Sequence, residues 1–171
     1  MVLSMIFNSR FRLATRTGAL LLAALCAGLL TSPGAWAGYT YVRAATIPES
    51  ALVQPAALVA ILEGPSDRTP LMLQVGAHVL YVQAHIPGSE YIGPGEEDEG
   101  LDALRTRVAK LQRDTPIILY CGCCPWDHCR NIGGAFAALE RLGFTEVKVL
   151  YLESDFGSNW VDQGYPVARG E

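Results

Sequence analysis

Apolar and polar positions along the chain follow a pattern that predicts three helices. Residues 55–63 carry apolar side chains at helical spacing and are followed by Gly64, which predicts a helix that stops there. The same spacing occurs over residues 101–111. It occurs again over residues 132–142, where Gly143 is expected to close the helix.

Short apolar runs between these helices predict strands at residues 71–75, 117–120 and 147–152. The run 117–120 is continuously apolar and is bounded by helix breakers, which is typical of a buried central strand. Residues 79–82 are expected to form either a further strand or the edge of a loop. Strands that alternate with helices predict an α/β fold with a central parallel sheet, flanked by helices on both faces.

The first 37 residues have the pattern of a secretory signal peptide. Three arginines between positions 10 and 16 form a basic head, residues 19–30 are almost wholly apolar, and Ala35-Trp36-Ala37 resembles a cleavage site. The apolar run is about 12 residues long, whereas a membrane-spanning helix needs about 20. Cleavage after Ala37 is therefore favoured over membrane anchoring, and the protein is expected to be periplasmic or secreted.

Removal of residues 1–37 leaves an N-terminal extension, residues 38–54, and one domain, residues 55–171. It also changes the formal net charge from −4 to −7, because three arginines and no acidic residue are lost. Part of the negative charge lies in the run 96–99, which predicts a solvated loop. Since no Lys/Arg cluster remains, we expect neither nucleic-acid binding nor stable membrane insertion.

Four of the five cysteines, Cys121, Cys123, Cys124 and Cys129, fall within nine residues directly after the strand 117–120. Disulfides that stabilise a fold usually close longer loops, so scaffolding is the weaker explanation. In open α/β sheets, ligands bind beyond the carboxyl ends of the strands. The cysteine loop also leads into the next helix, whose N-terminus favours a thiolate or an anion.

Four short motifs occur in an order that resembles the rhodanese-like domain family over roughly residues 55–167. They are Ala84-His85-Ile86-Pro87-Gly88-Ser89, the strand that ends in Cys121, Gly143-Phe144, and Trp160 followed by Gly164-Tyr165-Pro166-Val167. The resemblance implies the fold of that family and a sulfurtransferase activity. It also implies that Cys121 takes sulfur from a donor such as thiosulfate, holds it as a persulfide and passes it to a thiol.

The residues expected at this site lie between Cys121 and Asn131. Cys121 is the expected nucleophile, Cys124 a resolving thiol and Arg130 the anchor for an anion. The residues expected to contact the substrate are Gly122, Cys123, His128 and Asn131. No cofactor or metal is needed for this chemistry, and the expected partners are a small sulfur-donor anion or thiol and a periplasmic redox protein.

The chain also departs from the family pattern. Gln74-Val75-Gly76 stands where the family has Asp-Val-Arg, and eight residues separate Cys121 from Arg130. Because neither charge of the family's pair is present, we expect weak activity towards thiosulfate or a preference for another donor.

Several other interpretations of the loop stay open. Cys124 and Arg130 have the cysteine–x5–arginine spacing of rhodanese-fold phosphatases and arsenate reductases. Cys121 and Cys124 have the spacing of thiol–disulfide oxidoreductases, and the loop is also similar to the Cys-x-x-Cys-Trp proteins linked with quinoprotein alcohol oxidation. Inert disulfides are a further alternative. The rival class is a non-enzymatic module that binds copper, zinc or a partner through the cysteines.

Overall fold

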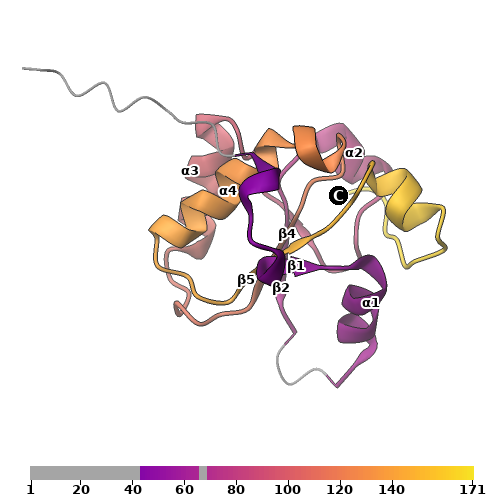
Figure 1. Cartoon of the computed structure of the whole chain (residues 1–171), viewed down its shortest axis with the longest axis horizontal. Coiled ribbons are helices and arrows are strands. Elements are labelled where there is room, and N and C mark those ends of the chain that lie inside the picture. Colours follow the sequence, from indigo (N-terminus) through magenta and orange to yellow (C-terminus); the bar gives the residue numbers. More distant parts are fainter. Residues whose placement is uncertain (1–42, 66–68) are drawn as a thin grey trace, which may run out of the picture. The chain divides into compact units, whose positions relative to one another are not determined.

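The computed structural model describes residues 43–65 and 69–171, which contain a five-stranded parallel sheet (Figure 1). The strands are β1 (Leu52–Val53), β2 (Leu71–Gln74), β3 (Glu90–Tyr91), β4 (Ile117–Tyr120) and β5 (Val147–Leu150). Their order across the sheet is β1-β5-β4-β2-β3, and every pair is parallel. The predicted central strand is confirmed, because β4 lies between β2 and β5.

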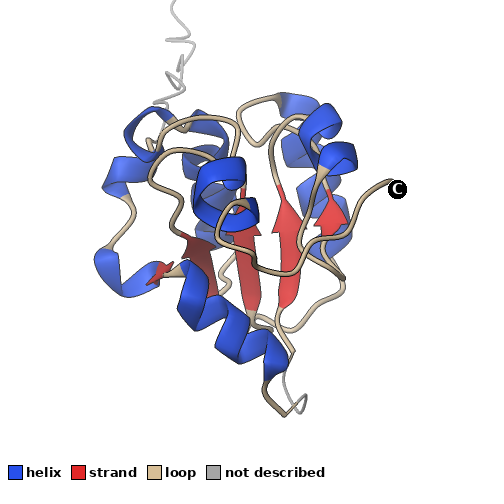
Figure 2. Cartoon of the chain, turned by 90° about the vertical axis from the view of Figure 1, so that its right-hand side faces the viewer, coloured by secondary structure: helices blue, strands red, loops and turns tan. Residues whose placement is uncertain are grey.

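Within these described ranges, four α-helices connect and cover the strands (Figure 2). They are α1 (Pro55–Glu63), α2 (His78–Gln83), α3 (Asp98–Val108) and α4 (Arg130–Arg141). Short helical turns are η1 (Ala44–Thr46), η2 (Glu49–Ala51), η4 (Trp126–His128) and the single π-helical turn η5 (Gly157–Val161). The predicted helix 55–63 has the observed bounds, and α4 ends where Gly143 adopts a φ of 84°.

The side chains of β4 divide between two cores, one on each face of the sheet. Ile117 and Leu119 pack with residues of α3 and α4, whereas Ile118 and Tyr120 pack with residues of α1 and the C-terminal segment. Figure 1 shows α3 and α4 on one side of the strands and α1 on the other. All four β4 side chains are buried, so the strand that leads into the cysteine loop is held from both faces.

The prediction of a strand or loop edge at residues 79–82 is wrong, since these residues belong to α2. A run of four apolar residues fits a strand or a helix equally well. The fold decides between them, because β3 occupies the edge of the sheet beside β2. Tyr81 then turns inwards, while Val79 is 60% exposed.

The acidic run 96–99 also differs from its prediction as a loop, because Asp98 and Glu99 form the first turn of α3. Their side chains are exposed, as expected for a solvated run. Negative charge at the first turn is favoured by the helix dipole, and this explains why the helix begins three residues earlier than predicted.

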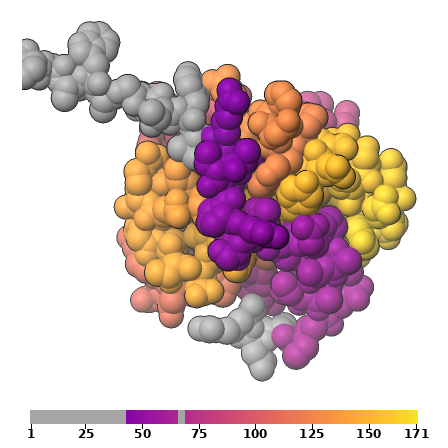
Figure 3. Space-filling view, in the orientation of Figure 1, coloured from indigo at the N-terminus to yellow at the C-terminus, as the bar shows by residue number. Residues whose placement is uncertain are grey.

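The described part of the expected N-terminal extension belongs to the same fold. β1 pairs with β5, and Ala44 of η1 is completely buried. The segment lies across the domain surface beside α4 (Figure 3). The predicted signal peptide, residues 1–37, lies outside the described residues. Within the described ranges, no helix has both the length and the apolarity required to cross a membrane.

Candidate functional site

The cysteine loop begins at the carboxyl end of the central strand, as the sequence predicts. Cys121 directly follows β4 and is 3% exposed. Its backbone is fixed by Gln74, which is also buried: the side-chain Nε2 of Gln74 donates to the carbonyl oxygen of Cys121 at 3.3 Å. The Oε1 of the same side chain accepts a hydrogen bond from the Gly76 N–H at 3.2 Å. Gln74 therefore ties the end of β2 to the first residue of the loop.

Two glycines leave room for the thiol and for the turn that follows it. A Cβ atom at Gly76 would lie 2.8 Å from the Cys121 Sγ, and one at Gly122 would lie 2.4 Å from the Cβ of Phe156. Gly122 also has a backbone φ of 75°, which residues other than glycine rarely adopt. The glycine that replaces the family's arginine thus makes space for the Cys121 sulfur.

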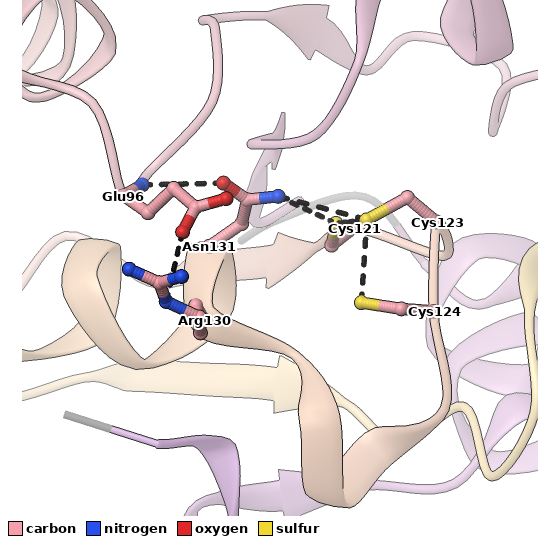
Figure 4. Close-up of polar contacts among 6 residues, drawn as sticks. All are labelled: Glu96, Cys121, Cys123, Cys124, Arg130 and Asn131. Carbon is pink, nitrogen blue, oxygen red and sulfur yellow. Dashed lines mark hydrogen bonds and ion pairs between the residues drawn. The ribbon is translucent and has the colours of Figure 1, made fainter. Parts of the chain in front are cut away.

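The thiols of the loop gather into one cluster (Figure 4). The Sγ atoms of Cys121 and Cys123 are 3.0 Å apart, and those of Cys123 and Cys124 are 3.4 Å apart. Cys129 also joins the cluster, since the Sγ atoms of Cys121, Cys123 and Cys129 all lie within 4.8 Å of one another. The four cysteines of the described loop are free thiols, so these contacts are hydrogen bonds and van der Waals contacts between unbonded sulfurs.

Asn131 holds this cluster from the first turn of α4. Its Nδ2 donates to the Sγ atoms of both Cys121 and Cys123 at 3.6 Å, and its Oδ1 accepts from the Glu96 N–H at 3.2 Å. Because Oδ1 faces a donor, the amide can turn only its NH₂ group towards the sulfurs. Figure 4 shows the side chain lying between Glu96 and the cysteines.

A close contact between two backbone segments positions Glu96 for this hydrogen bond. A Cβ atom at Gly134 would lie 2.0 Å from the carbonyl oxygen of Gly95, and one at Gly95 would lie 2.3 Å from that of Asn131. The loop before α3 can therefore pack directly on α4 only because both residues are glycine. This contact is the structural basis for the orientation of Asn131.

The N-terminus of α4 adds a favourable field for negative charge. Cys129 is the residue that caps this 12-residue helix, and its first turn contains no acidic side chain. The unpaired N–H groups of a helix's first turn carry a partial positive charge, which stabilises anions close to them. A thiolate or an anionic sulfur donor at the cluster benefits from both this field and the Asn131 amide.

Hydrogen bonds within the cluster separate the acidities of the thiols. The hydrogen bonds from Cys121 and then Cys129 lower the pKa of Cys123 far below its usual range. The contact with Cys123 in turn raises the pKa of Cys121. Burial, followed by the contact with Cys123, raises the pKa of Cys124, and contacts with Cys121 and Cys123 raise that of Cys129. The cluster therefore favours one thiolate and resists a second, and the single charge is shared between close sulfurs.

The ionisable side chains predicted at the site, Arg130 and His128, each contact a carboxylate. The Nε of Arg130 is 3.0 Å from Glu96 Oε2, and Figure 4 shows its guanidinium beside that carboxylate. His128 pairs with Asp127 at 2.7 Å, with both side chains largely exposed. The ring of Trp126 packs against Tyr151, with 5.1 Å between centroids. The roles predicted for Arg130 as the anchor of an anion and for His128 in substrate binding stay predictions.

Two contributors to the site were not expected from the sequence. In the sequence, Gln74 stands out only because it lacks the charge of the family's aspartate, yet its amide positions the Cys121 backbone. Glu96 contributes its backbone N–H, which donates to Asn131, and a pattern of side chains in the sequence cannot predict such a backbone contact. The convergence of Cys129 with Cys121 and Cys123 also depends on the path of the loop.

Comparison with known proteins gives a consistent result. The model of the rhodanese-like domain family matches residues 55–153. Thiosulfate sulfurtransferase YnjE from Escherichia coli (strain K12) is 33% identical over 104 residues, which cover 56% of this chain and 22% of that protein. The chain thus spans about a fifth of the length of this relative.

Solved structures of other proteins share the fold. The BH2092 protein from Bacillus halodurans is 24% identical and superposes with a TM-score of 0.53, over 70% of this chain and 77% of that one. The Alr3790 protein from Anabaena sp. is 21% identical, with a TM-score of 0.52, over 69% of this chain and 92% of that one. At these identities the likeness concerns the fold.

Proposed function

Because the chain belongs to the rhodanese-like domain family, we propose that it is a sulfurtransferase that holds sulfur as a persulfide on its cysteine loop. The observation that carries this proposal is the 3.0 Å contact between the Sγ atoms of Cys121 and Cys123 at the end of β4. This contact lowers the pKa of Cys123 and so favours a thiolate, which is the nucleophilic form of cysteine. The name of the relative YnjE, a thiosulfate sulfurtransferase, supports the same activity.

The first step is attack of a cysteine thiolate on the sulfane sulfur of a donor. With thiosulfate, the bond between sulfane sulfur and sulfonate sulfur breaks as the new S–S bond forms. A thiolate and thiosulfate become a persulfide anion and sulfite, so the total charge stays at −3. An acceptor thiol then takes the terminal sulfur, and the cysteine leaves as a thiol or thiolate.

Cys121 is the residue that we assign as the persulfide carrier. The buried strand β4 fixes its backbone, and the Gln74 amide holds its carbonyl oxygen. A preorganised position favours a reaction that needs an in-line approach. Cys123, whose thiolate lies 3.0 Å away, accepts the Cys121 proton as the Cys121 sulfur attacks the donor. The Asn131 amide can then donate to the terminal sulfur.

A thiol–disulfide reaction is the second candidate, and the same short contact favours it. If Cys123 attacks the inner sulfur of a Cys121 persulfide, a Cys121–Cys123 disulfide forms and hydrosulfide leaves. Cys124, 3.4 Å from Cys123, could then exchange with that disulfide. An external dithiol, such as a periplasmic redox protein, would have to reduce the disulfide before the next cycle.

The proposal is tested by sulfur loading of the purified domain, followed by intact-mass and peptide mass spectrometry. The donors are thiosulfate and glutathione persulfide, and the variants are Cys121→Ser, Cys123→Ser and Cys124→Ser. We expect a gain of one sulfur atom on Cys121 in the wild type and in Cys124→Ser, and no loading in Cys121→Ser. Cys123→Ser should load more slowly at neutral pH.

Two results would contradict the proposal. If Cys121→Ser still carries the extra sulfur and Cys124→Ser does not, the assignment of the carrier is wrong. If neither donor loads the wild-type protein, the sulfurtransferase proposal itself fails.

A further inference from the structure

We propose that Cys121, Cys123 and Cys129 form a three-sulfur site for a soft monovalent cation, Cu(I). Their Sγ atoms lie within 4.8 Å of one another, although the residues come from the start, the middle and the end of the loop. The site makes use of Cys129, which the sulfur-transfer chemistry does not need. It goes beyond the proposed sulfurtransferase function and does not depend on it.

The size of the sulfur triangle fits a metal ion. Thiolate sulfurs bind such ions at about 2.3 Å, so three of them around one ion stand about 4 Å apart. The observed upper limit of 4.8 Å and the 3.0 Å contact between Cys121 and Cys123 bracket this value. An ion could therefore be bound by side-chain movements of about 1 Å, without a change in the path of the backbone.

The groups around the three sulfurs shield them from water and orient them as metal ligands would be oriented. Cys121 and Cys129 are each 3% exposed, so two of the three ligands are already shielded from water. Asn131 donates to the sulfurs of Cys121 and Cys123, and hydrogen bonds of this kind orient metal ligands and offset their charge. The backbone of Cys129 is held from outside the loop, because its carbonyl oxygen accepts from the Ala44 N–H at 3.3 Å.

The number and type of ligands favour Cu(I) over zinc. Thiolates are soft ligands that select Cu(I), whereas structural zinc sites are almost always four-coordinate. Cys124 is not one of the three cysteines whose sulfurs all lie within 4.8 Å of one another. The nearby His128 is exposed and paired with Asp127. Among the described residues, the set of mutually close sulfurs thus has three members, Cys121, Cys123 and Cys129.

The test is an anaerobic titration of the purified, fully reduced domain with Cu(I), in competition with a chromophoric Cu(I) chelator. We expect one ion per chain and an X-ray absorption spectrum with about three sulfurs at about 2.3 Å. Cys123→Ser, at an exposed position, and Cys129→Ser should each weaken Cu(I) binding by more than about tenfold. Cys124→Ser is the matched control in the same loop and should bind like the wild type.

Other outcomes would overturn the inference. These are failure of the wild type to compete with the chelator, equal affinity in Cys123→Ser, a loss in Cys124→Ser as large as in Cys123→Ser, or displacement of Cu(I) by equimolar Zn²⁺. If Cys129→Ser does not fold, Cys123→Ser and the absorption spectrum still decide. Copper binding is measured without a sulfur donor and sulfur loading without copper, so loss of copper binding and loss of sulfur transfer can be told apart.

Discussion

Replacement of Cys121 by alanine or by serine separates two roles of its side chain. Alanine removes the group that donates a hydrogen bond to the Cys123 sulfur across 3.0 Å, whereas serine replaces it with a hydroxyl donor. Since the Cys121 contact is the largest cause of the lowered pKa of Cys123, we expect Cys121→Ala to raise that pKa and Cys121→Ser to leave it nearly unchanged.

The expected magnitude follows from the strength of the contact. A hydrogen bond to a charged group contributes about 1.5–3 kcal/mol, and about 1.4 kcal/mol corresponds to one pKa unit. Loss of the donor would therefore raise the pKa of Cys123 by one to two units if the site were dry. Cys123 is exposed, so water replaces part of the interaction, and we expect a rise of about one unit.

The assay is the rate of alkylation of Cys123 by iodoacetamide as a function of pH, followed by peptide mass spectrometry under reducing conditions. Only the thiolate reacts, so the rate falls as pH drops through the pKa of Cys123. The midpoint of the Cys121→Ala profile should lie at higher pH than that of the wild type. Identical midpoints for Cys121→Ala and the wild type would refute the reasoning, and so would equal shifts in the alanine and serine variants.

Three further predictions concern the surroundings of the cluster. Gly76→Ala should lower the free energy of unfolding by about 1–3 kcal/mol in urea denaturation, because the new methyl group would meet the Cys121 sulfur at 2.8 Å; unchanged stability would mean that the sulfur has room to move. Turnover of thiosulfate and cyanide should be weak, since Gln74 and Gly76 supply no charge for the donor, and robust turnover would show that these positions do not set donor choice. The exported protein should begin at Gly38 in intact-mass analysis, which retention of Met1 on a membrane-bound species would contradict.

The sequence alone determined the main frame of the domain. The run 117–120 was predicted as a short buried strand, because apolar side chains at every position need cover on both faces and breakers limit its length. The helix 55–63 was likewise predicted at its observed bounds from local spacing and Gly64. The position of Cys121 at a strand end followed directly, as did the fold class. Such features depend on residues that are close together in the sequence, so a single sequence is enough to predict them.

Tertiary structure decided the features that depend on contacts between distant segments. The run 79–82 became a helix because β3 took the edge of the sheet, and no local pattern contains that information. Asn131 faces the sulfurs because the Gly95–Gly134 contact brings the Glu96 N–H to its other end. The sulfur of Cys129 meets those of Cys121 and Cys123 only through the path of the folded loop. Hydrogen bonds and sulfur contacts act over a few ångströms, so which groups they join is fixed only once the whole chain has packed.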